Sequence, residues 1–170
     1  MRPLFLIGFM GAGKSTVGAL VAQKLGRPFL DLDTEIEREQ GVSVAQLFAT
    51  LGESGFRAAE RVALTGAAEI PGVVVACGGG VVTDEGSHAI LRERGVVVYL
   101  QVSPEEAVAR VGGDLTGRPL LRNGNLTAAA ALLKSRLRIY EAVADLVVDT
   151  AGRAPQQIAD EVVALTEGIE

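Results

Sequence analysis

Short, almost wholly apolar stretches alternate along this chain with longer stretches in which apolar residues recur every three or four positions. The short stretches predict buried β-strands, and the longer ones predict amphipathic helices. The expected strands lie at about residues 3–8, 28–32, 73–77, 96–100 and 146–149. The expected helices lie at about residues 14–25, 34–40, 44–51, 54–69, 83–94, 104–110, 127–144 and 155–166. This regular alternation predicts a three-layer α/β/α fold around a five-stranded parallel sheet.

The helical periodicity fails after Arg110, and residues 112–125 include four glycines without a stable apolar repeat. A loop of this length inside a compact domain is typical of a flexible lid or of a disordered segment. The chain has 170 residues, which suits one domain with a substantial core, and it contains no internal repeat, low-complexity segment or linker. We therefore expect a single domain over residues 1–170, with a lid inserted at about 112–125.

Composition and charge narrow the possible function classes. Hydrophobic residues make up 48% of the chain and charged residues 22%, as in an ordinary globular protein. The net charge of −5 argues against non-specific nucleic-acid binding. No apolar run approaches the length of about 18 residues that a membrane span needs, and the single cysteine cannot form an internal disulfide. We expect a cytoplasmic monomer without a signal peptide and without nucleic-acid or membrane partners.

The stretch from Gly8 to Thr16 reads GFMGAGKST and matches the motif G-x-x-x-x-G-K-[ST] in full. It follows a predicted strand and precedes a predicted helix, which is the context that this motif requires. The backbone N–H groups and the positive end of the helix dipole can surround phosphate, Lys14 can reach the outer phosphates, and Ser15 can bind Mg²⁺. The sequence therefore predicts a nucleoside-triphosphate site with these residues: Gly11, Ala12, Gly13, Lys14, Ser15 and Thr16.

Other polar or glycine-rich positions follow other predicted strands. Asp31 and Asp33 end the second strand, and the triple glycine at 78–80 follows the third. Ligands of open parallel sheets bind beyond the carboxyl ends of the strands. In an extended chain Asp31 and Asp33 face the same side, so one carboxylate could lie near Mg²⁺ and the other near an acceptor hydroxyl. Two alternatives stay open: Asp33 could be the N-cap of the next helix, and the glycines could form only a tight turn.

Arg136 is the most informative arginine in the sequence. It lies within the apolar stripe of the helix expected at 127–144, four residues after Leu132 and four before Tyr140. An arginine that faces a core must meet an anion there, supplied by the protein or by a ligand. The pattern therefore predicts an anion beside Arg136.

Two further arginines are ambiguous at this stage. Glu53 lies four residues before Arg57 and Glu60 three residues after it, so an ordinary salt-bridged helix face explains Arg57 equally well. Arg118 lies in the expected lid, where it could swing over the phosphates or remain a solvated loop charge. The sequence DLTG at 114–117 matches the D-x-x-G of GTPases, but it follows no strand and no N-K-x-D motif occurs. A GTPase is therefore discounted.

Taken in order along nearly the whole chain, these motifs resemble those of the shikimate kinase family. They are GFMGAGKST at 8–16, DLDTEIE at 31–37, GESGFRAAE at 52–60, CGGGVVT at 77–83, GRPLL at 117–121, SRLRIY at 135–140 and VDTAGRAP at 148–155. Many families share the phosphate loop, whereas the other motifs in this order are much more specific. The resemblance implies a P-loop NTP-binding fold and Mg²⁺-dependent transfer of the γ-phosphoryl group of ATP to the 3-hydroxyl of shikimate, a step toward chorismate and the aromatic amino acids.

On the nucleotide side, the resemblance implies that Lys14 and Arg118 neutralise the transferring phosphoryl group. Ser15 would bind Mg²⁺, and Asp31 would reach the ion through water. The residues that it implies around adenine are Arg110, Arg153 and Pro155.

On the acceptor side, the resemblance implies that Asp33 binds the ring hydroxyls and orients or deprotonates the attacking one. The residues that it implies around the shikimate carboxylate are Arg57, Gly79, Gly80 and Arg136. Glu60, on the same helix face as Arg57, would hold that arginine in position.

Three alternatives remain open. A gluconate kinase or another small-molecule P-loop kinase would share the loop and an acidic acceptor, but GESGFRAAE and CGGGVVT favour shikimate. A non-catalytic nucleotide-binding protein would not need the complete set of Lys14, Ser15, Asp31, Asp33 and Arg118. An enzyme similar to adenylate kinase is a weaker third alternative.

Overall fold

A five-stranded, wholly parallel sheet forms the centre of the protein, in the order β2-β3-β1-β4-β5. The structure is a computed structural model that describes residues 1–111 and 126–169. The strands are β1 (Leu4–Ile7), β2 (Phe29–Asp31), β3 (Val74–Ala76), β4 (Val96–Gln101) and β5 (Leu146–Asp149). All five strands were expected from the apolar runs, and the parallel sheet confirms the predicted fold class.

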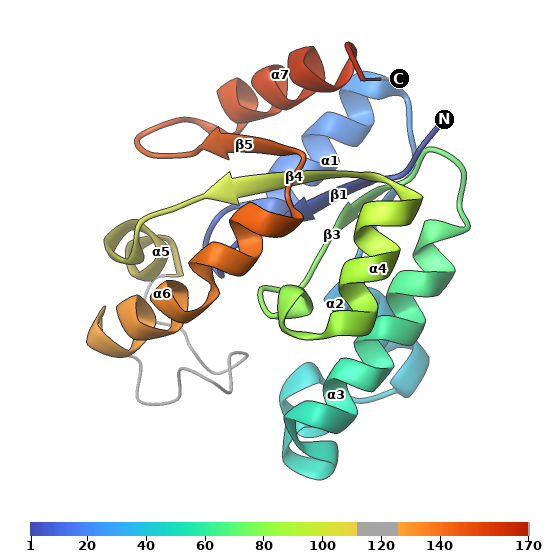
Figure 1. The fold of residues 1–170 in the computed structure, drawn as a ribbon, viewed down its shortest axis with the longest axis vertical. Coiled ribbons are helices and arrows are strands. Elements are labelled where there is room, and N and C mark those ends of the chain that lie inside the picture. The colour runs from blue at the N-terminus through green and yellow to red at the C-terminus, as the bar shows by residue number, and fades with distance from the viewer. Residues whose placement is uncertain (112–125, 170) are drawn as a thin grey trace.

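Helices cover both faces of this sheet (Figure 1). They are α1 (Lys14–Leu25), α2 (Leu32–Gln40), α3 (Val44–Ala68), α4 (Glu85–Arg94), α5 (Pro104–Val111), α6 (Leu126–Val143) and α7 (Pro155–Thr166), with a short 3₁₀ turn, η1 (Val81–Thr83). α1 and α7 pack together on one face, and α3, α4 and α6 lie on the other (Figure 1). The arrangement is the predicted three-layer α/β/α fold.

The central strands β1, β3 and β4 are apolar along nearly their whole length because both of their faces are covered. Every residue of β1 and β3 is at most 2% exposed. Since the chain contains few aromatic residues, branched aliphatic side chains fill most of this core. Tyr99 of β4 and Tyr140 of α6 add a stacked ring pair, with ring centroids 5.0 Å apart. Through this pair α6 packs against β4 of the sheet.

Two helix starts differ from the sequence-based expectation. α2 begins at Leu32 with Asp31 as its N-cap, whose Oδ1 accepts a hydrogen bond from the Thr34 amide at 3.2 Å. The helix expected at 34–40 therefore begins two residues earlier than predicted, and Asp33 is not its N-cap. Similarly, α4 begins at Glu85 with Asp84 as its N-cap, two residues later than the predicted start at Thr83. In both places an aspartate precedes the helix, and aspartate is a stronger capping residue than threonine.

The two helices expected between Ser43 and Glu69 are confirmed, and they follow one another across a kink as the element α3. α3 runs through both and contains one non-helical residue, Gly52, with φ 69°. Ser43 caps its start, in a capping box with Gln46. The left-handed conformation at Gly52 redirects the chain, so the segment after it carries Arg57 and Glu60 into the protein.

Within residues 1–111 and 126–169, the structure contains no helix with the length and apolarity that crossing a bilayer requires.

Candidate active site

The loop between β1 and α1 has the backbone shape of a phosphate cradle. Gly11 and Gly13 adopt left-handed conformations, with φ 74° and 88°, which side chains rarely permit. A Cβ at Gly11 would also lie 2.6 Å from the Ala107 carbonyl oxygen, so the loop packs closely against α5. α1 starts at Lys14 with Gly13 as its N-cap, and no side chain caps it. Its first N–H groups can therefore bind an anion.

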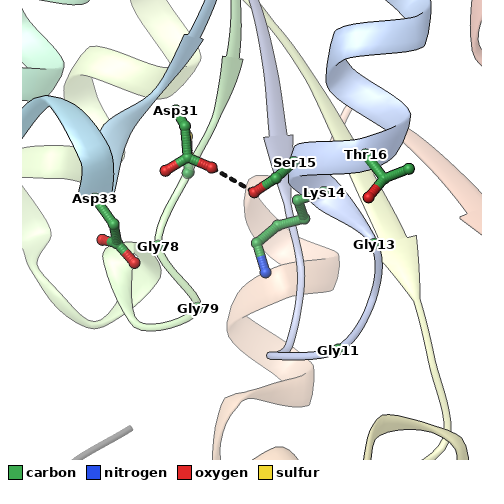
Figure 2. Close-up of a pocket in the computed structure, with 10 residues that line it drawn as sticks. Gly11, Gly13, Lys14, Ser15, Thr16, Asp31, Asp33, Gly78 and Gly79 are labelled. Carbon is green, nitrogen blue, oxygen red and sulfur yellow. Dashed lines mark hydrogen bonds between the residues drawn. The ribbon is translucent and has the colours of Figure 1, made fainter. Parts of the chain in front are cut away.

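Lys14 extends its side chain over this loop (Figure 2). Its Nζ donates hydrogen bonds to the carbonyl oxygens of Gly8 at 2.8 Å and Phe9 at 2.9 Å. These contacts hold the ammonium group at the mouth of the cradle, between Gly11 and Gly79 in the view of Figure 2. A cation in this place can contact the outer phosphates of a bound nucleotide.

Ser15 and Asp31 meet directly, because the Ser15 hydroxyl donates a hydrogen bond to Oδ2 of Asp31 (Figure 2). Mg²⁺ takes hard oxygen ligands and is held by one or two protein groups together with waters and substrate phosphates. The described residues contain no cluster of three or more His, Cys, Asp or Glu side chains that could hold a metal. A hydroxyl and one carboxylate beside a phosphate cradle fit Mg²⁺ of this kind.

Asp33 lies in the first turn of α2, with its carboxylate turned toward Gly78 (Figure 2). The prediction that Asp31 and Asp33 share one side of an extended strand is wrong, since only Asp31 belongs to β2. Both nevertheless line one cavity of about 240 Å³ with the phosphate loop. The two carboxylates reach the same cavity because α2 begins at Leu32, and not because they share one side of an extended strand.

The triple glycine after β3 allows charged side chains to approach the backbone closely. A Cβ at Gly78 would lie 2.5 Å from Oε2 of Glu60, and a Cβ at Gly80 would overlap Nη2 of Arg57. Neither glycine has a positive φ, so close approach and not turn geometry explains them. The sequence left open a choice between a ligand and a tight turn, and the structure adds a third reason. Gly78 and Gly80 leave room for the protein's own Arg57 and Glu60.

Arg57 and Glu60 form a buried ion pair. Nη1 of Arg57 donates to Oε1 of Glu60 at 2.8 Å, and the two residues are 8% and 0% exposed. The guanidinium also lies 5.3 Å and 5.6 Å from the ring centroids of Phe56 and Phe48. The helix salt bridges considered from the sequence are therefore present, but the one between Arg57 and Glu60 is buried. Arg57 is also 3.6 Å from the more exposed Glu53.

Burial raises the pKa of Glu60 to about 7, although Arg57 lowers it in part. Asp33 adds to the rise, and Arg136 opposes it. Glu60 Oε2 and Arg57 Nε are both buried without a hydrogen-bond partner in the described protein. The Glu60 carboxyl group therefore keeps its proton to a higher pH in the folded state than in the unfolded chain.

This shift predicts a pH-dependent stability difference between the wild type and Glu60→Gln. The unfolded chain loses the Glu60 proton near pH 4.5, whereas the folded protein keeps it to about pH 7. The wild type should therefore lose stability relative to the variant as pH rises through this window, by on the order of 3 kcal/mol. Urea unfolding of both proteins at a series of pH values measures the difference, and two parallel pH profiles would contradict the shift.

Arg136 lies where its helical pattern predicted, on the buried face of α6, and it is 3% exposed. Within the described part of the chain it forms no ion pair, although its charge opposes the rise in the pKa of Glu60. Its Nη1 lies 3.9 Å from the position that a Cβ of Gly79 would occupy. Arg136 and Arg57 therefore flank the triple glycine from α6 and α3.

Tyr140, one turn after Arg136 on α6, was expected only as part of an apolar stripe. Its hydroxyl donates a hydrogen bond to the Gly79 carbonyl oxygen. Burial raises the pKa of this phenol to about 12, so it remains a neutral donor. A tyrosine in a buried stripe needs a partner for its hydroxyl, which was the one signal of this role in the sequence.

A second cavity, of about 420 Å³, opens on the other side of the phosphate loop. The three residues predicted around adenine all line it: Arg110, Arg153 and Pro155. Thr16 and Val17 of α1 form its floor with Ile158 of α7. Arg118 and the lid expected at 112–125 lie outside the described residues.

The site combines a phosphate cradle at the edge of a parallel sheet, two oxygen groups suited to Mg²⁺, and a second carboxylate beside buried arginines. This combination is typical of one class of protein, the P-loop kinases that act on small anionic acceptors. The comparisons with known proteins give the family. The model of the shikimate kinase family matches residues 10–167. The chain is 44% identical over 165 residues to a shikimate kinase of Chromohalobacter salexigens, covering 96% of this chain and 91% of that protein.

A shikimate kinase of Pseudomonas entomophila is also 44% identical, over 93% of this chain and 92% of that protein. Among solved structures, a shikimate kinase from Acinetobacter baumannii in complex with shikimate superposes with a TM-score of 0.95. It is 37% identical, and the match covers 100% of this chain and 95% of that chain. The chain belongs to the shikimate kinase family.

Proposed function

We propose that this protein is a shikimate kinase, which transfers the γ-phosphoryl group of ATP to the 3-hydroxyl of shikimate and releases ADP and shikimate 3-phosphate. The observation that carries the proposal is the pair of buried arginines, Arg57 and Arg136, beside the phosphate loop. Two buried guanidiniums, of which Arg136 forms no ion pair within the described residues, favour an acceptor that brings its own negative charge. Shikimate carries a carboxylate and three hydroxyl groups, which suits this arrangement.

On the nucleotide side, we assign the phosphates of ATP to the loop residues Gly11, Ala12, Gly13 and Thr16 with Lys14. We assign adenine to the 420 Å³ cavity, with Arg110, Arg153 and Pro155 around it. Mg²⁺, bound by Ser15 and through water by Asp31, would neutralise charge on the phosphates. Arg118 is assigned to the transferring phosphoryl group from the sequence resemblance alone.

On the acceptor side, we assign the carboxylate of shikimate to Arg57 and Arg136, with backbone contacts from Gly79 and Gly80. The carboxylate and ring would then hold the 3-hydroxyl next to Asp33, in the cavity that Asp33 shares with Lys14. Phosphoryl transfer depends mainly on positioning and on neutralising charge. Asp33 would orient the hydroxyl and take its proton, and Lys14 would stabilise negative charge on the transferring group.

We propose that residues 1–170 form one kinase domain with a lid at 112–125. We also propose that the protein is a monomer and acts in the cytoplasm, where ATP is available. Exposed apolar side chains are scattered over several elements, among them Phe29, Leu51, Val62 and Val147, and do not favour a dimer face. The net charge of −5 supports the absence of a nucleic-acid partner, and we propose no membrane partner.

The product of the reaction tests this function. The purified protein, ATP, Mg²⁺ and shikimate should give one equivalent of ADP and one phosphate monoester whose phosphorus couples to the proton on C3 in ³¹P NMR. Removing Mg²⁺ with a chelator should abolish turnover. A phosphate ester at another hydroxyl, or ADP and free phosphate without an ester, would contradict the proposal.

A further inference from the structure

Arg110, close to the end of α5, is bonded to the phosphate loop itself. Its Nη1 donates to the carbonyl oxygens of Gly11 at 3.2 Å and, more weakly, Ala12 at 3.5 Å. These carbonyls belong to the loop whose N–H groups face the phosphates. The side chain is 30% exposed, and it lines the 420 Å³ cavity. Arg110 therefore contacts both parts of the proposed nucleotide site.

Thr150, directly after β5, holds this guanidinium with two oxygen atoms. Its hydroxyl accepts a hydrogen bond from Arg110 Nη1 at 3.1 Å, and its carbonyl oxygen accepts one from Nη2 at 2.8 Å. The same hydroxyl donates to the Gln101 carbonyl oxygen at 2.7 Å, and the Thr150 amide donates there at 3.0 Å. Thr150 is 0% exposed. These hydrogen bonds fix Thr150 to the end of β4, and Thr150 in turn fixes the position of the Arg110 guanidinium.

Glu106 completes the enclosure of the Arg110 guanidinium. Its Oε2 accepts from Arg110 Nη2 at 3.1 Å, and its Oε1 accepts from the Gly152 amide at 3.0 Å. Both terminal nitrogens of Arg110 therefore have protein acceptors. A guanidinium is planar with donors in a fixed fork, so these contacts fix the plane of the group as well as its place.

We infer that Thr150 is a positioning residue for the nucleotide: its hydroxyl and carbonyl hold Arg110 against the phosphate loop and along the wall of the 420 Å³ cavity. This inference rests on the proposed nucleotide site. The acceptor side should be unaffected, because Thr150 follows β5 at one edge of the sheet, whereas Asp33 follows β2 at the other.

The experiment is calorimetric titration of ADP into the full-length protein without any acceptor. Thr150→Val removes the hydroxyl and keeps the side chain's shape, so the dissociation constant of ADP should rise about tenfold, the effect of losing one hydrogen bond to a charged group. Thr150→Ser, which keeps the hydroxyl, should restore most of the affinity. Thr150→Ala adds no volume and replaces valine in the test if the valine variant does not fold.

Two further proteins separate positioning from a general loss of stability. Thr166 of α7 is also buried, and its hydroxyl bonds only to backbone carbonyls of its own helix. Thr166→Val should lower the melting temperature and leave the dissociation constant of ADP unchanged. In an Arg110→Ala background, Thr150→Val should have no further effect on the dissociation constant of ADP, because the guanidinium that Thr150 positions is absent.

The outcomes are distinguishable. A dissociation constant within twofold of wild type for Thr150→Val, an equal rise for Thr166→Val, or additive effects in the Arg110→Ala background would each overturn the role of Thr150. A wild-type protein that does not bind ADP would instead overturn the nucleotide site on which the inference rests. Because no acceptor is present, the result does not depend on whether the acceptor is shikimate.

Discussion

Asp33→Asn is expected to lower kcat by about 10²–10⁴-fold while ATP binding persists. The substitution keeps the size of the side chain but removes the charge and the ability to take a proton. Asp33 lies in the first turn of α2, in the cavity that also contains Lys14, so its loss should affect the chemical step. The nucleotide contacts assigned to the phosphate loop remain intact. Steady-state turnover and calorimetric titration of ADP measure the two effects separately.

The matched control for this variant is Glu39→Gln, which neutralises an exposed carboxylate on the same helix. It should leave kcat and ADP affinity at the wild-type values. Asp33→Asn with turnover close to wild type would show that Asp33 has no part in the chemical step. Loss of ADP binding together with turnover would show instead that the substitution damages the whole site.

Arg136→Ala is expected to raise the KM for shikimate by about a hundredfold or more and the KM for ATP by far less. Arg136 is buried beside Gly79 and forms no ion pair within the described residues. Removing one partner of a buried charge pair with the acceptor's carboxylate costs about 2–5 kcal/mol of binding free energy. Initial rates with each substrate varied in turn give the two KM values.

Arg138→Ala provides the matched control, because Arg138 lies two residues later on α6 and is exposed. It removes the same charge from the same helix and should change neither KM value. If Arg136→Ala raised the KM for ATP as much as that for shikimate, Arg136 would not be a specific contact for the acceptor's carboxylate. An equal effect of Arg138→Ala would point to net charge rather than a local contact.

The element pattern was predictable because it depends on local properties of the sequence. Runs such as Val73–Val75 are apolar and β-branched along their whole length, which in a parallel sheet indicates a strand covered on both faces. The phosphate loop has a motif that specifies its own geometry. Arg136 was predictable as buried since a helical period places it inside an apolar stripe.

Other features could not be derived from the spacing of residues in the sequence. The start of α2 depended on whether Asp31 or Thr34 would cap it, and both residues are good capping residues. The burial of Arg57 and Glu60 depends on the turn at Gly52 and on the room left by Gly78 and Gly80.

The contacts of Thr150 and Tyr140 likewise join segments far apart in the chain. Thr150 reaches Arg110, 40 residues away, and Tyr140 reaches Gly79, 61 residues away. Neither partner could be named before the fold was known. The resemblance to a family assigned roles to site residues, but it named a group that holds one of them in place only for Arg57, namely Glu60.

The central claim is that two buried arginines beside the phosphate loop select a shikimate carboxylate for phosphoryl transfer. Its most direct test is the rate of ADP release with ATP and Mg²⁺ in the presence of shikimate, gluconate or a nucleoside monophosphate. The proposed site predicts rapid ADP release with shikimate and little with the other two acceptors. Rates with gluconate or a nucleoside monophosphate equal to or above that with shikimate would contradict it.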